Sequence, residues 1–389
     1  MSALSPSSST ATELRRRFAP SPTDLREPVV PPSTELRGRF APSPTGRIHL
    51  GNIFTAVLSW LSVKSRGGRW VLRIEDLDPQ RSRLEYARLI EDDLRWLGLD
   101  WDEGGLDDLG PCGPYRQSLR SDIYAHYMQR LADTGLVYPC RCRRSDILAT
   151  QAPHQSDGRV VYHGTCRPAH LASLSTLGTF PTLSTFLSHL PTPSTLSVPP
   201  STISAPPSTI SNLQSTISNL QSNNCSAASR LYVPDCRVTY TDRVYGPQVS
   251  NLATDCGDFI VRRADGAWAY QLAVVVDDAL MGITEVMRGN DLLVSAPQQI
   301  YLMRLLGLPV PQFAHLPLVC NAAGQRLSKR DASMSMEQLR RRLSPEEILG
   351  RIACLAGWQP DFSPVSLATL LARYRDPAPR PSVLLPETI

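Results

Sequence analysis

One stretch near the amino end constrains the fold more than any other part of the chain. Residues 37–52 read Arg-Gly-Arg-Phe-Ala-Pro-Ser-Pro-Thr-Gly-Arg-Ile-His-Leu-Gly-Asn, which predicts a short strand, a Pro/Gly turn and a helix that continues to about Ser65. The free N–H groups of such a helix start form an anion site, to which His49 adds a donor, and Gly51 allows a close backbone approach. The pattern therefore indicates a nucleotide-phosphate site, although a His before a helix is more often a cap than a catalyst.

A second element of this kind lies near the other end of the chain. Residues 325–331 read Gln-Arg-Leu-Ser-Lys-Arg-Asp, a basic loop that follows a glycine. Two phosphate-handling elements at opposite ends of a chain suggest one nucleotide held between them. Together they resemble the HIGH and KMSKS signatures of class I aminoacyl-tRNA synthetases, and Arg-Phe-Ala-Pro-Ser-Pro-Thr-Gly over residues 39–46 resembles the glutamyl branch.

Composition sets broad limits on the protein class. The 389 residues are 42% hydrophobic, enough for two or three domains with a sizeable core, and the net charge of +4 permits an anionic partner such as RNA. Nine scattered cysteines do not resemble a disulfide framework, no apolar run is long enough to span a membrane, and the amino end lacks the apolar core of a secretory signal. We therefore expect a cytoplasmic protein with no membrane partner.

Two apolar runs predict buried strands of a parallel sheet. Arg69–Ile74 leads into Glu75 and Asp76, and Gln271–Val276 leads into Asp277 and Asp278. Acidic residues at the carboxyl ends of parallel strands lie in ligand crevices, although Glu75 and Asp76 could instead form a solvated turn that caps the next helix. The order strand, helix, strand predicts a right-handed parallel α/β unit, and the dinucleotide-binding Gly-x-Gly-x-x-Gly pattern is absent.

A group of cysteines predicts a small metal site. Cys140 and Cys142 lie one residue apart, and Cys166 follows a Tyr and a His. Three thiolates and one further ligand match structural zinc, but free surface thiols are the alternative. The fourth ligand could be Tyr162 or one of three nearby histidines, namely His154, His163 and His170.

The composition divides the chain into six segments. We expect a disordered extension with a partial repeat over 1–36, the first half of the catalytic domain over 37–137, a zinc-binding module over 138–168, a low-complexity Ser/Thr/Pro insertion over 169–228, the second half of the catalytic domain over 229–310, and a KMSKS-type loop with a helical C-terminal region over 311–389. The insertion contains repeats of seven residues with almost no charge, which favours disorder.

Taken together, the motifs resemble the glutamyl-Q tRNA(Asp) synthetases, a branch similar to the catalytic half of glutamyl-tRNA synthetase. The resemblance implies an α/β fold with a class I Rossmann-type parallel sheet, an inserted zinc module with one structural Zn²⁺ per chain, and a short helical C-terminal region. It implies an ATP-dependent ligase that activates L-glutamate without tRNA, using ATP with Mg²⁺, and transfers the glutamyl group to the queuosine base of tRNA(Asp). We expect a monomer without the anticodon-binding domain of the longer enzymes, since few residues follow Asp331.

The resemblance also implies roles for particular residues. Glutamate carries two carboxylates and one ammonium, so Arg39 and Arg288 are the candidate carboxylate partners and Glu75 the ammonium partner. The expected glutamate-binding residues are Arg39, Phe40, Ala41, Pro42, Ser43, Glu75, Tyr270 and Arg288; the catalytic residues are His49, Ser328 and Lys329; the ATP-binding residues are His49, Gly51, Asn52 and Lys329; and the metal ligands are Cys140, Cys142, Tyr162 and Cys166. Ser328 with Arg326 is expected to position the basic loop. Asn52 is a departure at the last position of the first signature.

Three other functions fit parts of the sequence. A truncated glutamyl-tRNA synthetase that charges the tRNA 3′ end would share nearly every site residue. A non-catalytic zinc module that binds RNA is disfavoured by the presence of His49, Lys329, Arg39 and Arg288. A nucleotidyltransferase of the same superfamily is disfavoured by the set of residues expected to bind glutamate.

Overall fold

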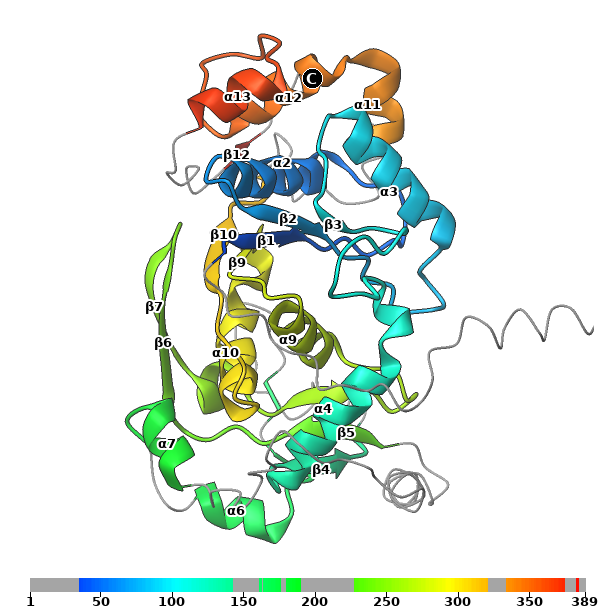
Figure 1. The fold of residues 1–389 in the computed structure, drawn as a ribbon. Coiled ribbons are helices and arrows are strands. Elements are labelled where there is room, and N and C mark those ends of the chain that lie inside the picture. Colours follow the sequence, from blue (N-terminus) through cyan, green and yellow to red (C-terminus); the bar gives the residue numbers. More distant parts are fainter. Residues whose placement is uncertain are drawn as a thin grey trace, which may run out of the picture.

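A computed structural model describes residues 35–142, 161–162, 164–175, 180–189, 227–320, 334–374 and 383–384 (Figure 1). Its centre is a parallel sheet of five strands in the order β10-β9-β1-β2-β3. The strands are β1 (Arg37–Phe40), β2 (Arg69–Leu72), β3 (Glu103–Gly104), β9 (Glu285–Gly289) and β10 (Gln312–Leu316). The predicted parallel α/β sheet is therefore confirmed.

Both faces of the sheet are covered, as a parallel sheet requires. Helices α2 (Leu50–Lys64) and α3 (Leu84–Trp96) lie on one face, and α9 (Tyr270–Leu280) and α10 (Ala296–Leu305) on the other (Figure 1). Neighbouring residues of one strand contribute to different cores: Val71 packs with α9 and α10, whereas Trp70 and Leu72 pack with α2. This alternation is the two-residue period of a strand buried on both sides.

Helix α2 packs closely on β1 because β1 contains a glycine at the contact. A Cβ placed on Gly38 would lie 2.4 Å from Cγ2 of Val63, near the end of α2. This separation is well inside van der Waals contact, so a larger residue at position 38 would push the helix away from the sheet. The contact sets the distance between α2 and β1, and therefore the position of the helix start.

The prediction of a second buried strand over Gln271–Val276 is wrong. These residues lie in helix α9, in which every residue from Leu272 to Leu280 is buried. The helix is enclosed between the sheet and a second layer, so it is apolar all round, and a short apolar run of this kind does not distinguish a helix from a strand. Asp277 and Asp278 continue the helix and point into buried ion pairs rather than following a strand end.

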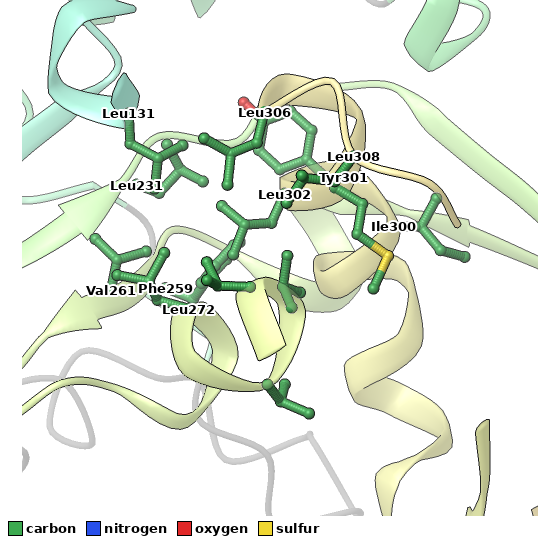
Figure 2. Close-up of a cluster of buried hydrophobic side chains, with 14 of the residues drawn as sticks. Leu131, Leu231, Phe259, Val261, Leu272, Ile300, Tyr301, Leu302, Leu306 and Leu308 are labelled. Atoms are coloured by element: carbon green, nitrogen blue, oxygen red, sulfur yellow. The ribbon is translucent and has the colours of Figure 1, made fainter. Parts of the chain in front are cut away.

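A smaller antiparallel sheet lies beyond α9 and α10 and shares their core. It contains β4 (Val137–Cys140), β5 (Ala228–Leu231) and β8 (Phe259–Arg262), and helix α4 (Ser121–Asp133) packs beside it after the short turn η1 (Gln117–Leu119). Figure 2 shows this core, in which Leu131 of α4, Leu231 of β5 and Leu302 of α10 lie together. A separate hairpin, β6 (Arg237–Asp242) and β7 (Gly246–Asn251), lies at one edge of the molecule (Figure 1).

The expectation of disorder over residues 169–228 is wrong for its first part. Residues Ala169–Ser175 form α6 and Leu183–His189 form α7. Leu183 is fully buried, and the Phe186 ring lies against Phe180 at 5.3 Å and Tyr301 at 6.4 Å between ring centroids. Apolar residues within the Ser/Thr-rich sequence therefore anchor this part on the core. The repeats of seven residues, and residues 1–34 of the amino-terminal extension, lie outside the described residues.

The C-terminal region is helical, as predicted. It contains α11 (Met336–Arg342), α12 (Pro345–Leu355) and α13 (Leu367–Arg373), which pack on the α2 face of the sheet (Figure 1). The short strands β11 (Val319–Cys320) and β12 (Val383–Leu384) pair in parallel nearby. Two further short helices, η2 (Leu252–Cys256) and η3 (Asn290–Ser295), follow β7 and β9. No described helix combines the length and the apolar character needed to cross a bilayer.

Candidate active site

A cavity of about 420 Å³ opens where the strand order of the sheet reverses. Strands β1 and β9 are neighbours there, but the chain leaves them in opposite directions across the sheet, and ligands of open α/β sheets bind at this point beyond the carboxyl ends of the strands. All predicted glutamate-binding residues, and those predicted ATP-binding residues that are described, line this one cavity: Arg39, Phe40, Ala41, Pro42, Ser43, His49, Gly51, Asn52, Glu75, Tyr270 and Arg288. The fold thus brings together residues as far apart in the sequence as Arg39 and Arg288.

The start of α2 forms one wall of the cavity. His49 is the N-cap residue: its Nδ1 accepts the N–H of Gly51 at 3.1 Å, and Oδ1 of Asn52 accepts the N–H of His49 at 3.1 Å. The unusual Asn52 therefore completes a reciprocal capping arrangement. Because Nδ1 accepts, a neutral His49 carries its proton on Nε2, which makes Nε2 the donor of the ring. The cap and the anion-binding interpretations of His49 are compatible.

A buried network of alternating charges forms the floor. Asp278 accepts from Arg39 at 3.2 Å and from Arg73 at 2.7 Å, and Arg73 also donates to Glu75 at 3.0 Å. Burial opposes ionisation of Asp278, but the two guanidinium groups outweigh it and lower its pKa. Burial is the largest effect on Glu75 and raises its pKa, in spite of the opposing influence of Arg73 and Arg39. Asp278 is therefore stabilised in its ionised form, whereas ionisation of Glu75 costs more free energy than ionisation of an ordinary glutamate.

Arg288 differs from Arg39 in its partners. Its guanidinium donates to three neutral acceptors, His315 Nε2 at 3.0 Å, Gln299 Oε1 at 2.8 Å and the Leu292 carbonyl at 3.2 Å. No carboxylate among the described residues lies within ion-pair distance of it. Burial lowers the pKa of Arg288. A buried cation held only by neutral groups favours an anionic ligand, whereas Arg39 already shares its charge with Asp278.

Sequence reasoning missed the residues that orient Arg288. His315 is fully buried in β10, and its Nδ1 donates to Asp242 Oδ2 at 2.6 Å. Gln299 lies on α10 and is also buried. A polar residue inside the apolar run Phe-Ala-His-Leu was the available signal for His315, because a buried polar side chain needs partners.

The basic loop that contains Arg326, Ser328 and Lys329 lies outside the described residues. Its flanks, however, reach the cavity. Val319 lines the cavity on one side of the loop, and on the other side Ser335 pairs with His49 and the N–H of Met336 donates to the Ile48 carbonyl at 2.9 Å. The roles of these three residues remain predictions.

The predicted cysteine cluster forms in the smaller module. The sulfur atoms of Cys140, Cys142 and Cys166 lie within 4.8 Å of one another, with Cys142 and Cys166 3.4 Å apart. The Tyr162 hydroxyl lies 3.4 Å from the Cys140 sulfur and 3.8 Å from the Cys142 sulfur. Sulfur ligands of tetrahedral zinc are separated by about 3.8 Å, given Zn–S bonds of about 2.3 Å. The three thiols and the phenol oxygen fit one such ion.

The alternative ligand His170 does not join this cluster. It is exposed, and its Nε2 lies 3.4 Å from the Gly135 carbonyl. His154 and His163 lie outside the described residues. Burial opposes ionisation of Cys166, but hydrogen bonds with Tyr162 and with the backbone of Arg141 outweigh it and lower the pKa of Cys166 to about 7. Burial raises the pKa of Cys142 to about 11, so Cys166 becomes the thiolate that a metal binds more readily than Cys142 does.

Comparison with known proteins identifies the family. The sequence model described as tRNA synthetases class I (E and Q), catalytic domain, matches residues 35–171 and 205–367. The chain belongs to this family. Class I synthetases are ATP-dependent ligases that use ATP with Mg²⁺, and this chain is such a ligase.

Relatives of this synthetase include both short and long proteins. The glutamyl-Q tRNA(Asp) synthetase of Nitratidesulfovibrio vulgaris is 42% identical over 90% of this chain and 89% of its own length. The glutamyl-Q tRNA(Asp) synthetase of Symbiobacterium thermophilum is 42% identical over 88% of this chain and 94% of its own length. Glutamate--tRNA ligase 2 of Acidithiobacillus ferrooxidans is 39% identical, but only 55% of it is covered. The crystal structure of the glutamate-tRNA synthetase from Elizabethkingia anophelis superimposes with a TM-score of 0.61 and 26% identity, over 88% of this chain and 66% of that one.

Proposed function

We propose that this synthetase activates L-glutamate with ATP in the absence of tRNA and transfers the glutamyl group to the queuosine base of tRNA(Asp). The observation that carries the proposal is the buried Arg288, a cation whose partners among the described residues are all neutral and which faces the same cavity as Glu75 and the start of α2. The acceptor is inferred from the short relatives, which bear the name glutamyl-Q tRNA(Asp) synthetase and are covered almost completely.

Glutamate would be bound by opposite charges on opposite walls. Arg288 would bind one carboxylate, because its guanidinium lacks a described anionic partner, and Arg39 would add a second, weaker positive charge beside Asp278. Glu75 would accept the substrate ammonium, which restores a favourable partner for this buried carboxylate. Tyr270 and Ser43 line the cavity between these charges and would provide hydrogen bonds.

Activation would take place at the start of α2. A carboxylate oxygen of glutamate attacks the α-phosphorus of ATP, the bond to the bridging oxygen breaks, and pyrophosphate leaves with its electron pair. His49 Nε2 and the N–H groups of α2 would hold the phosphates, Lys329 would neutralise the developing charge, and Ser328 with Arg326 would position the loop that carries Lys329. Mg²⁺, when bound to ATP, supplies further neutralisation of the phosphate oxygens. No covalent enzyme intermediate is required, so alignment is the main catalytic task.

The cysteine cluster would hold one structural Zn²⁺ through Cys140, Cys142, Cys166 and the Tyr162 oxygen. This ion would fix the segment after β4 against β5, since the Arg230 guanidinium of β5 already lies 3.9 Å from the centroid of the Tyr162 ring. We further expect the enzyme to act as a monomer in the cytoplasm, where its tRNA substrate is found.

The rival function is charging of the tRNA 3′ end with glutamate, as the name of the longer relative indicates. Purified enzyme should be incubated with ATP, radiolabelled glutamate and one of three RNAs: tRNA(Asp) with queuosine, tRNA(Asp) without it, and tRNA(Glu). The proposal predicts label only on the first, and the same label when the 3′-terminal adenosine has been removed from that tRNA before the reaction. Label on tRNA(Glu) that is lost when its 3′-terminal adenosine is removed would establish the rival.

A further inference from the structure

A second cavity of about 470 Å³ adjoins the catalytic cavity. The two share four lining residues, Ser43, Thr45, Glu75 and Tyr270. The rest of the second cavity comes from parts of the chain that do not reach the first, namely the turn after β2, η1 and the hairpin that follows β8. A group bound in the second cavity would therefore approach glutamate from the side away from α2 and the ATP phosphates.

An aromatic side chain held on several sides lines this second cavity. Trp268 Nε1 donates to the Ser121 hydroxyl at 2.9 Å, and its ring makes an edge contact with Tyr124 at 6.0 Å between centroids. The Arg262 guanidinium lies 4.8 Å from the centroid of the same ring. The indole is thus fixed before any ligand arrives. Fixed aromatic rings in protein walls are platforms on which unpaired bases stack.

The polar residues around Trp268 suit the other parts of a nucleotide. Arg81 and Arg263 are exposed cations of a cavity wall that also contains Asp78, and Arg263 forms an ion pair with Asp265 at 2.6 Å. Cations at such an edge bind the phosphates next to a base. Gln117 is buried in the same wall, where its Nε2 donates to Asp277 at 2.8 Å. An aromatic platform, a polar interior and a cationic edge together match an unpaired nucleoside within an RNA loop better than a second amino acid or a free nucleotide.

We infer that the second cavity receives the acceptor nucleoside during glutamyl transfer, an inference that rests on the proposed function. The queuosine base would stack on Trp268 while its flanking phosphates lie near Arg81 and Arg263. Ser43 and Tyr270 line both cavities, so the two ligands would meet beside them. There a hydroxyl oxygen of the queuosine cyclopentenediol attacks the carbonyl carbon of glutamyl adenylate. The new C–O ester bond forms, the C–O bond to AMP breaks, and the hydroxyl proton passes through the AMP phosphate to water.

Single-turnover transfer tests this assignment separately from activation. Enzyme loaded with glutamyl adenylate is mixed with queuosine-containing tRNA(Asp), and glutamate-dependent ATP–pyrophosphate exchange is measured on the same sample. The variants are Trp268→Ala, Trp268→Phe and Arg81→Ala; the matched control is Arg88→Ala, an exposed arginine of α3 that lines neither cavity.

We expect Trp268→Ala to slow transfer by about tenfold or more, because this variant loses about one base-stacking contact. The rate of ATP–pyrophosphate exchange should change by less than about twofold. Trp268→Phe should restore most of the transfer rate, and Arg81→Ala should raise the tRNA concentration required for half-maximal transfer more than Arg88→Ala does. Equal transfer by wild type and Trp268→Ala, with exchange intact in both, would overturn the inference. Absence of exchange in wild type would instead refute the proposed function.

Discussion

His315 holds Arg288 without neutralising it. Its Nε2 accepts from Arg288 Nε at 3.0 Å, while its Nδ1 donates to Asp242 at 2.6 Å, so one imidazole links a buried carboxylate to a buried guanidinium. Burial is the largest influence on His315 and lowers its pKa, which keeps the ring neutral near pH 7. Asp242 therefore fixes the tautomer of His315 without itself contacting Arg288. The full positive charge of Arg288 remains for a ligand.

Replacement of His315 tests this positioning role. Gln can accept from Arg288 and donate to Asp242, whereas Leu can do neither. We expect His315→Leu to raise KM for glutamate by about tenfold or more, because one charge-assisted hydrogen bond is worth about 1.5–3 kcal/mol, with little change in KM for ATP. His315→Gln should recover most of the affinity. If both variants behave alike in steady-state exchange kinetics, His315 is only a packing residue.

Arg288 itself should be sensitive to a conservative change. Arg288→Lys keeps the charge but loses the planar donors that hold His315, Gln299 and a ligand carboxylate together. We expect kcat/KM for glutamate to fall by about tenfold to a hundredfold. The Arg95→Lys variant, at an exposed arginine of α3, serves as the control. An Arg288→Lys enzyme with normal glutamate kinetics would remove Arg288 from the substrate site.

The raised pKa of Glu75 predicts how kcat/KM for glutamate changes at acidic pH. Burial raises the pKa of Glu75, so this carboxylate takes up a proton at a higher pH than an ordinary glutamate does. Only the ionised form attracts the substrate ammonium, and kcat/KM for glutamate should therefore fall as the pH is lowered through this raised pKa. Glu75→Gln should lower kcat/KM by about tenfold or more near pH 7 and remove this limb. A profile unchanged by Glu75→Gln would contradict the assignment.

The cysteine cluster should bind a metal that stabilises the small module. Cys166→Ser removes the thiol whose pKa is lowered to about 7, and we expect the purified variant to contain less than about half an equivalent of zinc and to unfold at a lower temperature. The control is Cys354→Ser, at a cysteine of α12 outside the cluster. Elemental analysis that finds no metal in wild type purified without chelator would refute the zinc site.

The contact between β1 and α2 gives a prediction about stability. Gly38→Ala places a Cβ 2.4 Å from Val63 Cγ2, and we expect it to lower the free energy of unfolding by about 1–3 kcal/mol. Val63→Ala creates space at the same point, so the double variant should lose less than the sum of the two single variants, as measured by urea unfolding. Additive losses would indicate that the two residues do not compete for this space.

The local sequence predicted those parts of the site that depend on short-range chemistry. The turn over residues 41–46 and the capped helix start are encoded by neighbouring residues, and β2 by a buried apolar run that ends before Glu75. The cysteine cluster was predictable because three thiols of suitable spacing have few other uses. These features need no knowledge of how distant elements pack.

The remaining features depend on packing between distant segments. Gln271–Val276 forms a helix because a layer lies on each side of it, and its apolar sequence is compatible with a strand. The pairing of Arg39 with Asp278, which leaves Arg288 as the stronger anion site, joins residues of β1 and α9 far apart in sequence. In the same way, His315 acquires its role only when β10 pairs with β9.

The most direct test of the account is ATP–pyrophosphate exchange by the purified enzyme with L-glutamate and no tRNA, compared with Arg288→Ala under the same conditions. The account predicts exchange by wild type with L-glutamate but not with L-aspartate, L-glutamine or D-glutamate, and little exchange by the variant. Exchange that appears only when tRNA(Glu) is added, or no exchange by well-folded wild type in either condition, would contradict it.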